Sequence, residues 1–205
     1  MKSLLVFLAL CGLAILPGCS SQSSAPEKPQ PKPPEFITGR SAFQKLYGAA
    51  HGWARDAQPY RLLSQPTEDC KGLDGKSGVW RASFASPAQH STRPYVWSGS
   101  NGKDAPERGV NPGSEDNYSP TNSSTQVFDM AFLKVDSDQA FKIAQEHEGE
   151  KLLQKLPDSL IFYELEWSGP TSELIWHVYY GTSRNDAKLK VDVNASTGAF
   201  LRAVK

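Results

Sequence analysis

The chain has 205 residues with 22 basic and 22 acidic side chains, so its formal net charge is zero. This balance argues against proteins that bind nucleic acids through a clustered basic surface, and we expect no nucleic-acid partner. The length suits one larger domain or two smaller ones.

The first 18 residues have the layout of a secretion signal. Lys2 supplies a positive charge, and the apolar run from Leu4 to Leu16 is shorter than the ~20 residues that span a bilayer. The segment Leu16-Pro17-Gly18-Cys19 resembles the lipobox of bacterial lipoproteins, where a peptidase cuts before a cysteine that carries diacylglycerol. We therefore expect residues 1–18 to be a lipoprotein signal peptide and Cys19 to be lipidated. The alternative is a plain signal peptide that ends in a chance cysteine.

The residues after Cys19 indicate a tether. Residues 20–35 contain five prolines and no hydrophobic cluster, so residues 19–35 are expected to link the anchor to a folded domain. Two acyl chains suffice for stable membrane attachment. Ser20 after the cysteine resembles an outer-membrane address. We expect a lipid-anchored protein of the bacterial cell envelope, on the outer membrane and facing the periplasm or the surface.

Side chains that would carry out chemistry are sparse. Cys70 is the one cysteine beyond Cys19, and its polar, turn-rich surroundings predict an incidental thiol. The four histidines lie far apart and lack zinc-helix spacing. Glu164 and Glu166 are better explained by charge pairing with His177 and Lys190 on neighbouring strands. We expect no catalytic residues, no metal and no cofactor, and hence no enzyme.

Two parts of the chain repeat in the same order. AFLKV (131–135) returns as AFLRAV (199–204), and the pairs Trp80/Trp176 and Gly102/Gly198 share one offset of 96 residues. Residues 103–130 have no counterpart in the second part. This pattern indicates a diverged duplication with an insertion in the first copy.

Periodicity gives both copies the same expected structure. In the first copy, Thr38 can cap a helix, and strands follow near 60–64, 78–84, 93–98 and 131–135. In the second copy, the acidic run from Asp136 can cap a helix that precedes strands near 161–167, 174–180, 188–193 and 199–204. The predicted fold is α+β: two tandem units, 36–135 and 136–205, each with one helix packed on a four-stranded antiparallel meander. A polar insertion, about 98–125, interrupts the first unit. The core is expected to include Trp80, Trp97, Trp167 and Trp176.

The second unit resembles the PepSY domain. The resemblance rests on Trp176-His177-Val178 in a middle strand and on Asp192, Thr197 and Gly198 in the closing turn. It extends to the first unit through the repeat. PepSY-like modules have been linked to restraint of peptidases, and two in tandem resemble the architecture of the β-lactamase inhibitory protein, which presents a curved sheet to an enzyme. The resemblance implies binding without catalytic residues.

The expected function is therefore noncovalent binding by a membrane-anchored lipoprotein. Partners would be the membrane, through the lipid anchor, and an envelope protein or a peptidase. The candidate binding surface comprises His177 and Tyr179, which point away from the predicted core, and Tyr118 in the insertion. A structural or assembly lipoprotein with no specific ligand is the first alternative, and an enzyme is the second.

Overall fold

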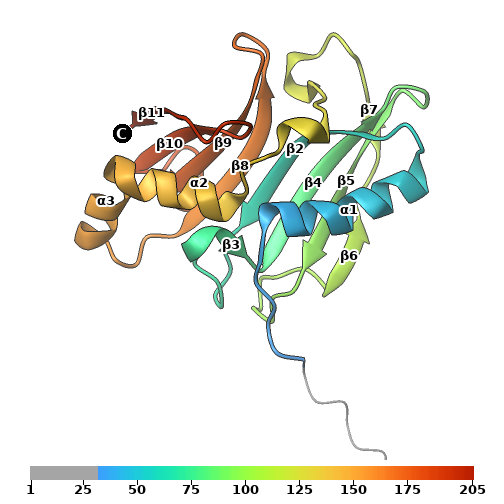
Figure 1. The fold of residues 1–205 in the computed structure, drawn as a ribbon. Helices are drawn as coiled ribbons and strands as arrows, with labels where there is room; N and C mark the ends of the chain where they lie inside the picture. The colour runs from blue at the N-terminus through green and yellow to red at the C-terminus, as the bar shows by residue number, and fades with distance from the viewer. Residues whose placement is uncertain (1–31) are drawn as a thin grey trace, which may run out of the picture. The chain divides into compact units, whose positions relative to one another are not determined.

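The computed structural model describes residues 32–205, so the predicted signal peptide, Cys19 and most of the linker lie outside the described residues. This part of the chain is mostly β: a nine-stranded antiparallel sheet carries helices on one face (Figure 1). Within residues 32–205, no helix is both long and apolar enough to cross a membrane.

The elements follow one another along the chain with short connections. The strands are β1 (Ile37–Thr38), β2 (Gln58–Gln65), β3 (Lys76–Ser77), β4 (Val79–Ser86), β5 (Ser91–Ser98), β6 (Gly109–Pro112), β7 (Asp116–Asn117), β8 (Ile161–Ser168), β9 (Glu173–Tyr180), β10 (Leu189–Asn194) and β11 (Phe200–Val204). The α-helices are α1 (Gly39–Trp53), α2 (Ser137–Ala144) and α3 (Glu150–Lys155), with 3₁₀ turns η1 (Leu73–Gly75), η2 (Ser123–Thr125) and η3 (Met130–Phe132) and a π-type turn η4 (Gln145–Gly149). The sheet order is β11-β10-β9-β8-β2-β4-β5-β6, and β7 also pairs with β5.

The prediction of two tandem helix-on-four-strand units is wrong, because one sheet runs through both parts of the chain. Strand β2 pairs with β8, with Leu62 opposite Leu165 and Leu63 opposite Glu164. Each of these strands would otherwise be an edge with unpaired backbone groups. Pairing them satisfies those groups and buries Leu62 and Leu165 in one core. The expected boundary between residues 135 and 136 therefore separates no independent units.

The predicted closing strand at residues 131–135 is also wrong. The Asp129 carboxylate accepts a hydrogen bond from Ala131 N at 2.8 Å and starts the 3₁₀ turn η3 in its place. Phe132 then packs against Trp167, with ring centroids 5.3 Å apart. The related AFLRAV stretch does form a strand, β11. Similar sequences thus adopt different structures: the second pairs with β10, whereas β5, at the corresponding place in the first part of the chain, is paired with β6 and β7.

The 98–125 segment, predicted to be a polar insertion, contributes strands to the sheet. Strand β6 pairs with β5, with Val110 opposite Trp97, and β7 pairs with the other end of β5. The sequence of β6, Gly-Val-Asn-Pro, lacks the alternation of apolar and polar residues that is typical of a strand, so the sequence did not predict it. Strands β6 and β7 thus cover the side of β5 that the predicted closing strand was expected to cover.

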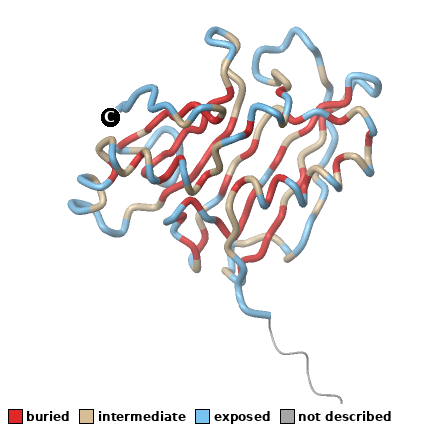
Figure 2. Tube along the Cα trace, viewed as in Figure 1, coloured by how far each residue is buried: buried red, intermediate tan, exposed pale blue. Residues whose placement is uncertain are grey.

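Alternating apolar residues do form the other predicted strands. Strands β2, β4, β5, β8, β9, β10 and β11 all lie where alternation placed them. Trp80, Trp97 and Trp176 are buried, and Trp167 packs on the same core, as predicted. Figure 2 shows buried positions along the strands and on the sheet-facing side of the helices, with exposed positions in the loops.

The N-termini of α1 and α2 share one set of capping groups. Asp136 caps α2 in a capping box with Gln139, as the sequence predicts. Its Oδ1 also accepts from Arg40 N at 2.8 Å, and Ser137 Oγ accepts from Gly39 N at 2.7 Å. The expected cap of α1, Thr38, makes no side-chain cap bond to the helix. Helix α1 therefore depends on residues almost one hundred positions away for its N-terminal hydrogen bonds.

Two tryptophans lie beneath this junction. The Trp80 indole N–H donates to Ile37 O at 3.0 Å, and the Trp176 indole N–H donates to Val135 O at 2.9 Å. The two rings meet edge to face with centroids 6.4 Å apart. Each tryptophan thus holds the backbone just before one helix, and the segment before Ile37 is held further by a bond from Glu35 N to Gly99 O at 2.9 Å.

The tight packing over these rings predicts opposite effects for two glycines of α1. A Cβ at Gly39 would lie 2.6 Å from Trp176 Cη2, whereas a Cβ at Gly48 meets nothing within 4 Å. Because the buried tryptophan has no room to move, Gly39→Ala should lower the free energy of unfolding by about 1–3 kcal/mol. Gly48→Ala should raise it by about 0.5–1 kcal/mol through helix propensity. Urea unfolding measures both, and equal effects at the two positions would contradict this account of the junction.

Candidate binding site on the helix-free face of the sheet

One row of side chains crosses the face of the sheet that the helices leave uncovered, which we call the helix-free face. Residues directly opposite one another on paired antiparallel strands project from the same side of a sheet. Register links the row across six strands, from β4 to β11: Arg81, Leu63, Glu164, His177, Asp192 and Arg202. Arg81 and Arg202 lie at the two ends of the row. Between them lie a leucine, two acidic residues and a histidine.

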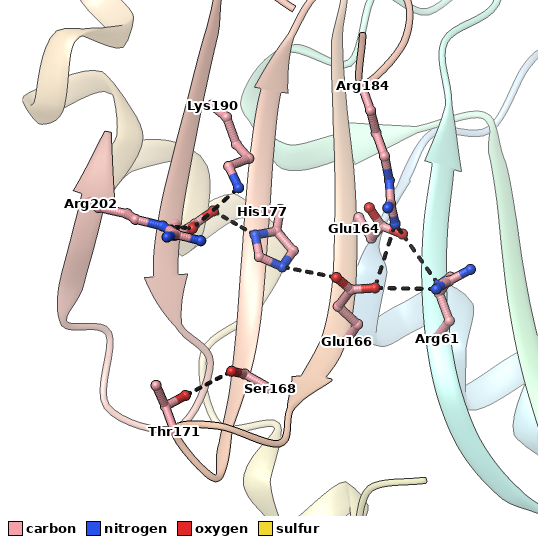
Figure 3. A network of polar contacts seen from close by, with 10 residues as sticks. Arg61, Glu164, Glu166, Ser168, Thr171, His177, Arg184, Lys190 and Arg202 are labelled. Atoms are coloured by element: carbon pink, nitrogen blue, oxygen red, sulfur yellow. Dashed lines mark hydrogen bonds and ion pairs between the residues drawn. The ribbon is translucent and has the colours of Figure 1, made fainter. Parts of the chain in front are cut away.

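Two arginines bind the carboxylates of β8. Arg61 lies 3.3 Å from Glu164 Oε1 through Nε and 3.4 Å from Glu166 Oε2 through Nη2. Arg184, from the loop between β9 and β10, pairs with the same two carboxylates (Figure 3). The loop is therefore attached to the sheet through charge, with Arg184 lying over β8.

His177 connects this pair of carboxylates to a second group of charges. Its Nε2 lies 3.4 Å from Glu166 Oε1 and its Nδ1 lies 2.5 Å from Asp192 Oδ1. The other oxygen of Asp192 is 2.6 Å from Arg202 Nε and 3.5 Å from Lys190 Nζ (Figure 3). A continuous network of ion pairs thus extends from β2 to β11.

Two acids of this network are buried, and an exposed arginine is bound to each of them. The Glu164 and Asp192 side chains are each 1% exposed, against 49% for Arg184 and 63% for Arg202. Four cations, namely Arg61, Arg184, Lys190 and Arg202, face three carboxylates and His177. A molecule approaching this face therefore meets positive groups whose positions are set by carboxylates beneath them.

The network shifts the pKa values of its members. The hydrogen bond from His177 lowers the Glu166 pKa to about 2. Burial opposes ionisation of Asp192, yet its bonds to His177 and Arg202 lower its pKa to about 2. Burial likewise opposes protonation of His177, but the bonds to Asp192 and Glu166 outweigh it and raise the His177 pKa above 6.5. Glu166 and Asp192 are therefore charged at neutral pH.

This arrangement suits recognition of acidic groups. Guanidinium groups held in a fixed orientation match the planar geometry of a carboxylate and can bind it through two parallel hydrogen bonds. His177 has both ring nitrogens next to carboxylates, so neither is open to act as a general base. Among residues 32–205, no group of three or more His, Cys, Asp or Glu side chains could hold a metal ion.

The structure places three of the predicted site residues, in two different settings. His177 and Tyr179 do project from the helix-free face, with ring centroids 6.1 Å apart, but both are buried. Tyr179 stacks on Phe162 at 4.5 Å, and burial raises its pKa to about 12. Tyr118 follows β7 and binds the His90 carbonyl through its backbone, so it lies with the other half of the sheet. Cys19 lies outside the described residues.

The sequence did not predict the three arginines of the network, Arg61, Arg184 and Arg202, as site residues. The predicted pairing of Glu166 with His177 is confirmed, but Glu164 pairs with Arg61 and Arg184 in place of Lys190. The alternation of β10 and β11 carried a signal, because it puts Arg202 on the same face as Asp192 once the two strands are aligned. Arg61 and Arg184 required knowledge of the β2–β8 pairing and of the loop conformation.

Cys70 has the setting of a structural thiol. It is buried, and its Sγ lies 3.7 Å from the Lys76 carbonyl oxygen. Burial raises its pKa, so the thiol stays protonated at neutral pH. This agrees with the prediction of an unreactive cysteine.

Comparison with known proteins shows the fold. No family model matches the chain, and no curated protein matches it either. The structure is similar to the crystal structure of a candidate lipoprotein from Clostridium difficile 630, with a TM-score of 0.52 and 11% identity over 80% of this chain and 91% of that one. At this identity the likeness concerns the architecture alone. The resemblance to PepSY domains stays a prediction.

The raised His177 pKa predicts a loss of stability at alkaline pH. The folded protein holds the imidazole proton more tightly than the unfolded chain does, because the folded pKa lies above 6.5. The resulting stabilisation is complete below pH 6.5 and disappears as pH rises through the folded pKa. Urea unfolding from pH 6 to about pH 9 should show a falling free energy of unfolding for the wild type and a flatter profile for His177→Gln.

The exposed His90 offers a control for this experiment. It has a φ of 52°, which asparagine tolerates, so His90→Asn should keep the wild-type dependence on pH. Parallel profiles for the wild type and His177→Gln would show that the His177 proton contributes nothing to stability.

Proposed function

We propose that this protein is a lipid-anchored envelope protein that binds an acidic surface of a partner protein noncovalently through the helix-free face. One observation carries the proposal: Glu164 and Asp192 are 1% exposed, while the Arg184 and Arg202 side chains bound to them are 49% and 63% exposed. The buried acids hold the exposed cations in place before a partner arrives. Less side-chain entropy is then lost on binding.

The lipid anchor of this proposal rests on the lipobox-like residues before Cys19. The similar fold of a candidate lipoprotein supports it, since the same architecture is found in such a protein. We propose the outer membrane as the location because Ser20 follows the cysteine. The PepSY resemblance makes a peptidase the first partner class to test. Binding is proposed in preference to catalysis.

Metabolic labelling with an alkyne analogue of palmitate tests the anchor. We expect the wild type to incorporate the label and Cys19→Ser to lose it, because the thioether forms at that sulfur. Cys70→Ser is the matched control and should stay labelled, since Cys70 is buried inside the folded domain. Label that persists on Cys19→Ser would refute lipidation at this residue.

Removal of the two exposed guanidiniums tests the binding surface. The double variant Arg184→Gln/Arg202→Gln should capture its partner from an envelope extract at least tenfold more weakly than the wild type. Each lost charge-assisted hydrogen bond contributes about 1.5–3 kcal/mol. Lys45→Gln/Lys142→Gln is the matched control, because both lysines are exposed on helices of the opposite face and the change in charge is the same. Captured proteins are quantified by mass spectrometry.

The proposal requires at least one protein that the wild type and the control retain and the arginine variant loses. Thermal unfolding of all three chains shows whether the substitutions leave the fold intact. If no protein behaves in this way, the helix-free face is not a docking surface, and the structural or assembly alternative becomes the better account.

A further inference from the structure

A second positively charged surface lies at the end of the helix layer, around α3 and the turn that follows it (Figure 1). Two adjoining hollows, of about 670 and 240 Å³, share Lys155, Leu156 and Lys188 as lining residues. Lys71 lines the first hollow, and Lys151 and Lys205 line the second. We call this area the lysine surface.

The lysine surface has more positive than negative charge. Its acids are already engaged: Asp158 binds Lys71 at 2.7 Å, and Glu148 binds Lys151 at 3.0 Å and Lys205 at 2.8 Å. Asp186 accepts hydrogen bonds from the backbone and hydroxyl groups of Thr182 and Ser183. Within residues 32–205, neither Lys155 nor Lys188 belongs to an ion pair. Two ammonium groups are thus available at the centre of the surface.

An apolar side chain lines the same two hollows as these ammonium groups. Leu156 is 48% exposed, the most of any large apolar side chain in the described residues. It follows the last residue of α3 in the turn that continues with the exposed Pro157. The backbone of the turn is fixed, with Leu156 N bound to Leu152 O at 2.8 Å and Ser159 N to Leu156 O at 3.1 Å. Leu156 is therefore held in an exposed position.

The kind of cation distinguishes this surface from the helix-free face. There, arginines are fixed by buried carboxylates and suit a partner with carboxylates in fixed positions. Here, flexible lysines surround an exposed leucine. An ammonium group is a point charge without a preferred plane, so it can follow phosphate groups that move within a fluid layer. An apolar side chain among lysines is also the pattern of segments that lie at a membrane interface.

We propose that the lysine surface binds the headgroup region of an anionic phospholipid bilayer, with Leu156 inserted among the upper acyl carbons and Lys155 and Lys188 next to lipid phosphates. The inference goes beyond the proposed function, because it concerns another surface and another ligand. The two are compatible, since the thirteen residues between Cys19 and Pro33 let those two residues lie at most ~50 Å apart. A lipid-anchored domain would therefore stay close enough to a bilayer for this contact.

Cosedimentation with vesicles tests the proposal. The chain used begins at Ser20 and carries no lipid, and it retains every residue of the described fold. The vesicles contain equal amounts of phosphatidylglycerol and phosphatidylcholine, and pure phosphatidylcholine vesicles are the uncharged comparison. We expect binding to the anionic vesicles alone and its loss in 0.5 M NaCl, because salt screens the attraction.

Two variants locate the contact. Lys155→Glu/Lys188→Glu should weaken binding to anionic vesicles at least about tenfold, since each basic residue near such a surface contributes to attachment. Lys45→Glu/Lys103→Glu changes the net charge equally at exposed positions elsewhere and should bind like the wild type. Leu156→Ser should weaken binding several-fold without a change in charge.

Three outcomes would overturn the proposal. The first is no binding to anionic vesicles, and the second is an equal loss in both lysine pairs, which would mean attraction without a defined surface. The third is binding of soluble poly-L-glutamate that Lys155→Glu/Lys188→Glu abolishes, with no vesicle binding, which would assign the surface to an acidic protein. Failure of the proposed function would leave these results unchanged, because Arg184 and Arg202 are intact in every chain used.

Discussion

The pairing of β2 with β8 is the interaction on which the rest of the structure depends. It joins the strands before and after α2 into one sheet and brings Leu62 and Leu165 into one core. The charged network depends on it as well, because Arg61 reaches Glu164 and Glu166 only across this boundary. Without the pairing, Glu164 would lose one of the two arginines that compensate its buried charge. A buried carboxylate with fewer partners is costly, so the sheet and the network stabilise each other.

On the other face of the sheet, the helices also join the two halves of the chain. Asp136 serves the N-termini of α1 and α2 at once, and Trp80 and Trp176 meet directly beneath them. Helix α1 loses its N-terminal hydrogen bonds when α2 is displaced, because Asp136 and Ser137 accept them. The two faces of the sheet therefore connect the same halves of the chain, one through backbone caps and aromatic packing and the other through ion pairs. We expect the described domain to unfold in a single cooperative transition for this reason.

Local patterns in the sequence were sufficient to predict most of the strands and the helix starts, but not how the strands pair in the sheet. Alternation located β8, β9 and β10, and Asp136 identified the start of α2, because these signals depend on neighbouring residues only. The pairing of β2 with β8 has no local signal, so the fold was wrongly divided into two units. Similarity between AFLKV and AFLRAV suggested a strand where Asp129 starts a 3₁₀ turn.

At the candidate site, His177 and Tyr179 were placed on the correct face, but their burial depends on residues such as Phe162 and on the cross-strand register. The exposed cations there, Arg184 and Arg202, come from a loop and a strand whose positions only the tertiary structure defines.

The hydrogen bonds at the start of the described chain have a mechanical consequence. Any pull on the residues before Pro33 acts first on the bond from Arg108 Nη1 to Pro33 O, at 3.1 Å. It acts next on the bond from Glu35 N to Gly99 O, which joins the entering segment to the residue after β5. At Ile37 two restraints follow together: the pairing of β1 with β3 and the bond from the Trp80 indole to Ile37 O, and Trp80 is fully buried in the core. Tension is thus transmitted to an aromatic ring at the centre of the sheet before it reaches α1. A domain attached at this end can resist traction through its core, and the hydrogen bonds that hold the entering segment all lie outside β8 to β11.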